Sequence, residues 1–305
     1  MNNTRIPILL LGLLLAATAR AELPASLGHA AAEVATVPAQ RQALAADLES
    51  AMNAGVDEPD LQAVMRMAST QRYSAPHTAA FVQKLAAVRR DGMPVSLIRD
   101  KILEGMVKKV PAENILTVAS QWQGALKDAR SSVQAMEERG LKYDKASERE
   151  TLINLDAGLR QRYGAKDALP RLAESAGDGK RITAGAESLI AAGNLAELLF
   201  LYNTPSAQAL ELPKASLKAG YTPVQIQTLQ RTVLDQLRQG MAPADVITGT
   251  LRQFNTKAAS PTVKPSFSDP SQRPGESWPG GGMPGGGMPG GGPGGGFPKG
   301  GGGGF

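Results

Sequence analysis

Glutamates that lie beside apolar residues are the side chains of this sequence best suited to chemistry. A carboxyl group in an apolar cleft can hold a proton near neutral pH and act as a general acid, and a helical hydrolase of cell-wall glycans needs little more than that. Glu104, Glu187 and Glu197 each have apolar neighbours in the sequence. Glutamates on the surface of any helical protein would share this feature, so we assign none of the three as catalytic.

Other motifs that could carry chemistry are incomplete. The two histidines, His29 and His77, belong to no HExxH pattern and to no pair at metal-ligand spacing. Residues 177–180 read Gly-Asp-Gly-Lys, but Arg181 stands where a phosphate-binding loop has Ser or Thr, which favours a turn between helices. We therefore assign no catalytic residue, no cofactor-binding residue, no metal ligand and no cofactor.

Two basic pairs, Arg89–Arg90 and Lys108–Lys109, lie near expected helix C-termini. Basic side chains there oppose the negative end of the helix dipole, which is a structural role. The functional alternative is contact with an anionic polymer or lipid surface. Few aromatic residues accompany these pairs, so we expect no nucleic-acid partner. Trp122 lies on an apolar stripe and is expected in the core.

A recurring pattern of Gly, an apolar residue and Pro predicts how the helices are joined. The stretch Asp91–Trp122 is echoed by Ala219–Phe254, and in both a Gly and an apolar residue precede the Pro that opens the next helix. Glycine can adopt a positive φ after a helix, the apolar residue packs back on the last turn, and proline suits a first turn where its missing N–H has no partner. Pairs that precede a proline in this way are Gly55–Val56, Gly92–Met93, Gly220–Tyr221 and Gly240–Met241.

Apolar residues recur at helical spacing along most of the chain, as in Val95, Ile98, Ile102 and Met106. Alternating runs of β-branched residues between turn signals are missing. The sequence therefore predicts an all-α fold, a helical-hairpin array that is either an irregular α-solenoid or an orthogonal bundle. The echo is a duplication, two rows of such an array, or a chance recurrence of helix boundaries, and its period looks irregular.

Domain boundaries follow from composition. We expect a flexible N-terminal segment over 22–37 and an all-helical domain over 38–255, with a division into halves at about 140 left open. Within it, Val133–Arg139 is rich in charge and is expected to project from the core. Asn194 with Glu197 and Thr222 with Gln225 have the spacing of capping boxes at helix starts.

The first 21 residues have the pattern of an export signal. Arg5 precedes the apolar run Ile6–Ala17, and Ala19-Arg20-Ala21 forms a small-x-small cleavage site. A helix over Ile6–Ala19 would be roughly 21 Å long, short of the roughly 30 Å of a bilayer core. No later stretch is long and apolar enough to anchor the chain, so we expect no integral membrane segment after cleavage and a soluble protein that is periplasmic or secreted.

Charge and cysteine content limit the partners and the kinds of site that this chain can have. Removal of residues 1–21 would leave 31 basic and 28 acidic residues, a small excess that is weak evidence for nucleic acid or acidic membranes as partners. The absence of cysteine excludes disulfides, thiolate metal sites and cysteine nucleophiles.

The C-terminal segment 256–305 is rich in Gly, Pro and Met. Ordering about 50 such residues would cost on the order of 75 kcal/mol of conformational entropy with little apolar burial to offset it, so we expect disorder. Isolated apolar residues on it could bind a partner groove or a wall polymer weakly and repeatedly, although a linker without a partner explains them too. They are Met283, Met288, Phe297 and Phe305.

These observations favour an exported, non-catalytic interaction or scaffold protein of the cell envelope. The helical core would offer the binding surface and the tail a second contact, with a protein or an envelope polymer as partner. The alternative is an envelope-acting enzyme, such as a helical peptidoglycan hydrolase that uses one Glu in a cleft. The oligomeric state stays open.

Overall fold

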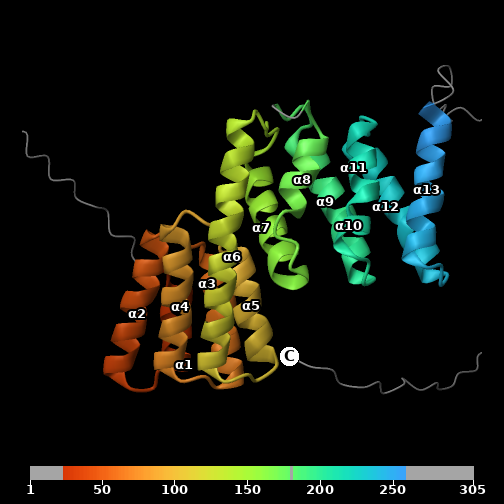
Figure 1. Ribbon diagram of the computed structural model, residues 1–305. Helices are drawn as coiled ribbons and strands as arrows, with labels where there is room; N and C mark the ends of the chain where they lie inside the picture. The colour runs from red at the N-terminus through yellow and green to blue at the C-terminus, as the bar shows by residue number, and fades with distance from the viewer. Residues whose placement is uncertain (1–22, 179–180, 259–305) are drawn as a thin grey trace, which may run out of the picture. The chain divides into compact units, whose positions relative to one another are not determined.

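The computed structural model describes residues 23–178 and 181–258 (Figure 1). The predicted signal peptide, and the predicted tail beyond Ala258, lie outside these residues. The described chain is helical, and its one extended pairing is an isolated bridge between Gly177 and Ile182. The predicted all-α fold is therefore confirmed.

The helices follow the chain in the order shown in Figure 1. They are α1 (Ala25–Val34), α2 (Pro38–Asn53), α3 (Glu58–Gln71), α4 (Ala75–Arg90), α5 (Ser96–Val107), α6 (Ala112–Glu138), α7 (Ala146–Tyr163), α8 (Ala168–Ser175), α9 (Ala186–Leu201), α10 (Ser206–Ala209), α11 (Glu211–Lys218), α12 (Pro223–Arg238) and α13 (Pro243–Ala258).

The helices stack in two rows, with the hairpins side by side (Figure 1). In the first row α2, α4, α6, α7, α9 and α12 each contact the next. In the second row α1, α3 and α5 follow one another, as do α8, α11 and α13, and α6 contacts both α5 and α8 across the interruption. This arrangement is the helical-hairpin array that the sequence predicts, in its solenoid form.

The array has a period of 37 residues over most of its length. Helices α2, α4 and α6 begin at residues 38, 75 and 112, and α9 and α12 begin at 186 and 223. Left-handed residues that end the helices recur at the same interval, as in Gly55 and Gly92 or Arg72 and Lys109. The array is irregular in the region of α6 to α8 and in the starts of its second-row helices, as the sequence predicts, whereas the first-row helices on either side keep a 37-residue spacing. Sequence comparison did not detect this spacing because it lies in the helix boundaries rather than in residue identity.

The two echoing stretches lie half a repeat out of phase. Asp91–Trp122 contains α5 of the second row followed by α6, which begins in the first row, whereas Ala219–Phe254 contains α12 of the first row followed by α13 of the second. The same Gly–apolar–Pro pattern ends helices of both rows, so local sequence alone does not distinguish the rows. The echo is a match of turn chemistry and does not align equivalent helices.

The predicted turn chemistry itself is confirmed. Gly55, Gly92, Gly220 and Gly240 have φ between 69° and 88°. The residue after each glycine donates its backbone N–H to a carbonyl five residues back, as Met93 does to Val88, which satisfies the end of the helix. Val56 and Met93 are buried against the last turn, but Met241 is 39% exposed. Arg72, Lys109 and Asn203 adopt the same left-handed conformation without being glycine, and the sequence reading missed them.

Two expectations about flexible or projecting segments are wrong. The segment 22–37, expected to be flexible, contains α1, whose Leu27 and Ala31 are buried and which packs on α3 as an extra helix at the start of the second row. The end of α6, expected to project over Val133–Arg139, buries Val133 and Met136 because α7 and α8 pack against it.

The two predicted capping boxes have opposite outcomes. At α12, Gln225 donates its backbone N–H to Thr222 Oγ1 and accepts the Thr222 N–H at its side-chain oxygen, as predicted. Asn194 and Glu197 lie inside α9, which begins eight residues earlier at Ala186, so that box is wrong. The apolar run after Asn194 continues an existing helix and does not start one.

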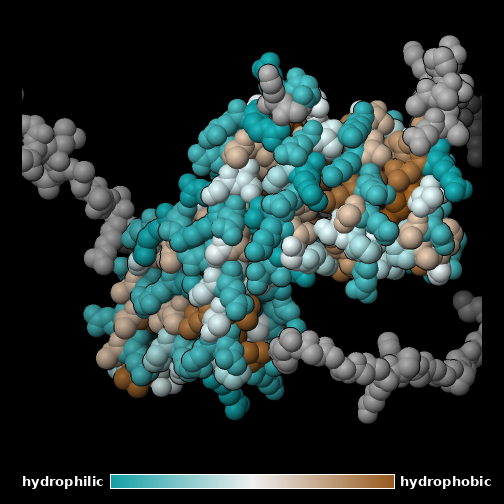
Figure 2. All heavy atoms as spheres, viewed as in Figure 1, coloured by the Kyte–Doolittle hydropathy of each residue, from teal (hydrophilic) through white to brown (hydrophobic). Residues whose placement is uncertain are grey.

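The described helices belong to one compact unit with a continuous apolar core. Within residues 23–178 and 181–258, every helix is too short or too polar to cross a lipid bilayer. Figure 2 shows a largely hydrophilic face, with hydrophobic atoms visible between α11 and α13 near the end of the array. No further described helix covers α13.

Candidate functional site at the break in the array

The repeat is interrupted where α6 meets α7. The 27-residue α6 begins where the 37-residue spacing places a first-row helix, but it continues through the positions where a turn and a second-row helix are expected. Helix α7 then begins three residues before the position that the 37-residue spacing predicts. Three of the described side chains that bury a polar atom without a hydrogen-bond partner are on α7: Glu148, Asn154 and Asp156. This concentration makes the break the candidate functional site.

Asp156 lies in the interface between α6 and α7. It is fully buried and accepts a hydrogen bond from Arg160 Nε at 2.7 Å, while Arg160 Nη2 donates to Ser132 Oγ on α6 at 2.6 Å. Burial raises the pKa of Asp156 to about 6, against the opposing effect of Arg160. The side chain is enclosed, so the arrangement joins two helices through a carboxyl group that titrates near neutral pH.

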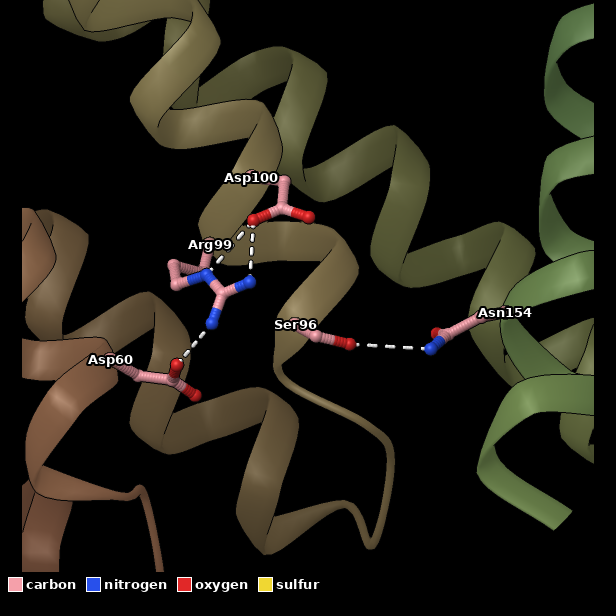
Figure 3. Close-up of polar contacts among 5 residues, drawn as sticks. All are labelled: Asp60, Ser96, Arg99, Asp100 and Asn154. Carbon is pink, nitrogen blue, oxygen red and sulfur yellow. Dashed lines mark hydrogen bonds and ion pairs between the residues drawn. The ribbon is translucent and has the colours of Figure 1, made fainter. Parts of the chain in front are cut away.

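Asn154 connects α7 to the regular part of the array. Its side-chain amide donates to Ser96 Oγ, 3.2 Å away at the start of α5, as Figure 3 shows. Three residues further along α5, Arg99 pairs with Asp60 of α3 and with its neighbour Asp100. These contacts form a polar chain from α3 through α5 to α7, so the break is held to the preceding hairpins by hydrogen bonds as well as by apolar packing.

Three carboxylates, the carboxylate trio of Asp144, Glu148 and Glu187, meet at the start of α7 and α9. One oxygen of each lies within 4.8 Å of the others. Glu148 Oε2 accepts the backbone N–H of Asp144 at 2.9 Å, which resembles the reach-back bond of a capping box. Two negative charges at such a distance repel by about 1 kcal/mol in water and by about 3 kcal/mol at an effective dielectric of about 20.

The trio lies where two loops are joined by the backbone. Ala186, the first residue of α9, donates its N–H to Lys142 O at 3.0 Å, and Ile182 donates to Arg139 O at 2.9 Å. Glu148 and Glu187 therefore sit on the first turns of two helices that the loop contacts hold together, and Asp144 lies in the loop just before α7. The positive ends of the helix dipoles favour carboxylates there, by about 0.3 to 1 kcal/mol each at exposed positions.

The three glutamates selected from sequence lie apart and have different surroundings. Glu104 bonds to Lys101 and Lys108, and these hydrogen bonds lower its pKa to about 2. A general acid must hold its proton near neutral pH, so Glu104 is unsuited to that role. Glu197 pairs with Arg162 at 2.9 Å, and Glu187 belongs to the trio.

The two basic pairs do not form one surface. Arg89 and Arg90 end α4, whereas Lys108 and Lys109 follow α5, which returns antiparallel to α4 in the same hairpin. The 12 residues of α5 separate the two pairs by roughly 18 Å. Arg89 is also engaged, since its Nε donates to Gly55 O at 3.0 Å.

Arg90 instead joins basic residues of α6 that sequence reasoning did not select. An open hollow of about 480 Å³ is lined by Arg90, Asp91, Lys127, Arg130, Ser131 and Gln134. A neighbouring hollow of about 390 Å³ shares Arg90 and is lined also by Ala46, Glu49, Ser50, Asn53 and Ala54. We call the first of these the basic hollow. It runs over α4 and α6, and the second continues it to α2.

The remaining sequence candidates form local contacts with neighbouring side chains. His77 lies 3.2 Å from Glu113 of α6, and His29 lies 3.5 Å from Glu33 within α1. Trp122 is buried, as expected, with the Lys101 ammonium 5.2 Å and the Arg162 guanidinium 5.7 Å from its ring centroids. Around the Gly-Asp-Gly-Lys segment, the bridge of Gly177 with Ile182 indicates a turn; residues 179–180 lie outside the described part.

The trio could have been found only in part from sequence. Asp144 and Glu148 are four residues apart at a predicted helix start, so the sequence places these two carboxylates near each other. Glu187 is 39 residues beyond Glu148, and nothing local indicates that the loops before α7 and α9 meet. Comparison adds no information on the site, because no protein-family model, no curated protein and no solved structure matches the chain.

Proposed function

We propose that this protein is an exported, non-catalytic interaction scaffold of the cell envelope. The observation that supports this most is the two-row array, in which successive hairpins present equivalent edges side by side. Such arrays are extended binding surfaces because each repeat adds area without changing the surface that precedes it. The export signal and the tail contribute to the proposal from sequence alone.

The binding surface that we propose is the basic hollow on the first row. Arg90, Lys127 and Arg130 are exposed there, and each also has a polar neighbour that orients it. Arg90 donates to Ser50 Oγ at 2.8 Å, and Lys127 lies 3.1 Å from Asp91. Arginines held in place lose less conformational freedom on binding, which favours an anionic protein segment or envelope polymer as the partner.

The tail would provide the second contact. Met283, Met288, Phe297 and Phe305 are spaced along its Gly- and Pro-rich part, and repeated weak contacts gain strength when they are linked to a first binding site. In this proposal the hollow selects the partner and the tail increases its residence time.

The test is site-specific photo-crosslinking in cells. A photoreactive residue at Ser131 or Gln134, beside the basic hollow, should capture a reproducible envelope partner. The same residue at Thr70, on the edge that carries Lys109, should not. Reversing charge with Arg90→Glu, Lys127→Glu and Arg130→Glu should lower the yield at least about tenfold, which corresponds to about 1.4 kcal/mol.

The matched control reverses the same type of charge on the other edge with Lys108→Glu and Lys109→Glu, and the yield at Ser131 should stay unchanged. Equal capture from both edges would show that the hollow selects nothing. Fractionation of cells expressing the chain with and without residues 1–21 tests export, and retention of both forms in the cytoplasm would refute it.

A further inference from the structure

The carboxylate trio combines acidic groups from two helices at one point. Asp144 lies in the loop two residues before α7, Glu148 lies in the first turn of α7, and Glu187 lies in the first turn of α9. Each offers an oxygen within 4.8 Å of the other two. Carboxylate oxygens converging from separate elements are the donors that hard divalent cations prefer.

A second observation distinguishes this cluster from ordinary surface acids. Glu148 is only 5% exposed, and its Oε1 is buried without a hydrogen-bond partner in the described part of the chain. Its other oxygen, Oε2, is already used by the backbone of Asp144. A buried carboxylate oxygen normally has a partner, and Glu148 Oε1, on a residue that belongs to the trio, has none in the described chain.

Neighbouring basic groups do not supply that ligand. None of the three carboxylates forms an ion pair with a described Lys or Arg, although the acids around them do: Glu137 with Arg149, and Glu150 with Arg89. The N-terminal ends of α7 and α9 favour each carboxylate separately, but they do not remove the repulsion among the three.

We propose that Asp144, Glu148 and Glu187 together bind one Ca²⁺ ion. Ca²⁺ holds oxygens at about 2.3–2.6 Å, so two of its ligands lie up to about 5 Å apart, which the observed spacing satisfies. Mg²⁺ binds at about 2.0–2.1 Å, requires a near-octahedral set and keeps several of its waters, so a cluster of three protein carboxylates favours Ca²⁺. Asp144 and Glu187 are exposed, so water completes the coordination.

The ion would stabilise the array where its repeat is interrupted. It would join the start of α7 to the start of α9, next to the backbone bond from Ala186 to Lys142. Binding to the folded chain alone stabilises it by mass action, so Ca²⁺ would raise the melting temperature. This inference does not depend on the basic hollow or on the identity of a partner.

The experiment titrates the purified chain from residue 22 to residue 305 with CaCl₂ and with MgCl₂, using calorimetry and thermal unfolding. We expect one Ca²⁺ per chain, an affinity in the range of about 10⁻⁴ to 10⁻³ M typical of extracellular calcium modules, and a higher melting temperature. Mg²⁺ at equal concentration should bind at least about tenfold more weakly. Added KCl serves as the ionic-strength control.

Variants assign the site. Glu187→Gln changes an exposed residue and should weaken Ca²⁺ binding at least about tenfold while the folded state persists. Glu148→Gln keeps an oxygen for the Asp144 N–H and should abolish binding. Glu113→Gln, in the exposed first turn of α6, should leave binding unchanged. No heat and no melting shift with the unaltered chain, equal responses to Mg²⁺, or unchanged binding in Glu187→Gln would each overturn the proposal.

Discussion

The hairpins from α2 to α5 and the break from α6 to α9 are built from similar helices but place their polar groups differently. In the hairpins, polar side chains bond across the surface to the next repeat, as Gln83 does to Asp47 and Tyr73 to Val110 O. At the break, Glu148, Asn154 and Asp156 bury polar atoms that have no partner in the described chain. Regular stacking needs no buried charge, so the break carries polar groups that packing alone does not explain.

The largest expected difference between the two regions concerns an arginine. Arg160→Leu removes the cation beside fully buried Asp156 and should lower the free energy of unfolding by about 3–5 kcal/mol near neutral pH. Glu150→Gln removes only the exposed carboxylate beside Arg89 and should cost at most about 1 kcal/mol. Urea unfolding measures both. Equal losses would contradict the comparison, and Arg160→Leu with Asp156→Leu should recover most of the larger loss.

The pH dependence of stability should reveal Asp156. Burial raises the pKa of Asp156 to about 6, above its ordinary value of 3.8, so the folded state holds the proton more tightly than the unfolded state. The contribution of Asp156 to the free energy of unfolding is fully present below about pH 4 and is lost as the pH rises through about 6, an effect of about 3 kcal/mol. Asp156→Asn should remove this slope when unfolding is measured from pH 4 to 7. Parallel pH profiles for the two proteins would refute the assignment.

A glycine tests the packing of the regular hairpins. A Cβ on Gly105 would lie 2.6 Å from Ile115 Cγ1, so Gly105→Ala should destabilise by about 1–3 kcal/mol despite the better helix propensity of alanine. The sequence alone gives the opposite sign, a gain of about 1 kcal/mol. Gly124→Ala in α6 has nothing within 4 Å and is the control that should show this gain. Thermal unfolding of both variants decides between the two expectations.

The smallest effect is expected at an exposed ion pair of the regular region. Hydrogen bonds from Lys101 and then Lys108 lower the pKa of Glu104 to about 2. The contribution of this ionised carboxylate to the free energy of unfolding is therefore present above about pH 4.5 and is lost as the pH falls through about 2. Because the side chain is 42% exposed, Glu104→Gln should cost about 0.5 kcal/mol, less in high salt. A loss as large as that of Arg160→Leu would remove the contrast between the regions.

Local signals predicted the helices well because helix ends have their own chemistry. The glycine turns, the capping box at Thr222 and the stripe through Ile98 and Ile102 all occur where the sequence places them. The row of each helix could not be predicted, because the same turn ends helices of both rows. Burial of Val133 was missed since it depends on α7 and α8, which pack against α6 from later in the chain.

The candidate site was harder to predict than the fold. Asp156 is a single acid within an apolar stretch, and its burial depends on α6 lying against α7. The trio needs the loops before α7 and α9 to meet through the bond from Ala186 to Lys142. Glu104 was selected from sequence although its surroundings do not suit catalysis. Its apolar neighbours in the sequence suggested a cleft, but ion pairs with two lysines on adjacent turns make it an ordinary surface acid.

The long helix α6 has a consequence for how the array unfolds. Repeats that touch only their neighbours can open one after another from the ends, so terminal hairpins exchange their amide hydrogens first. Because α6 contacts α4, α5, α7 and α8, neither half of the array can lose its order without uncovering the same helix. Unfolding of the two halves is then a single cooperative event, and the amides of α6 should be the last to exchange with deuterium.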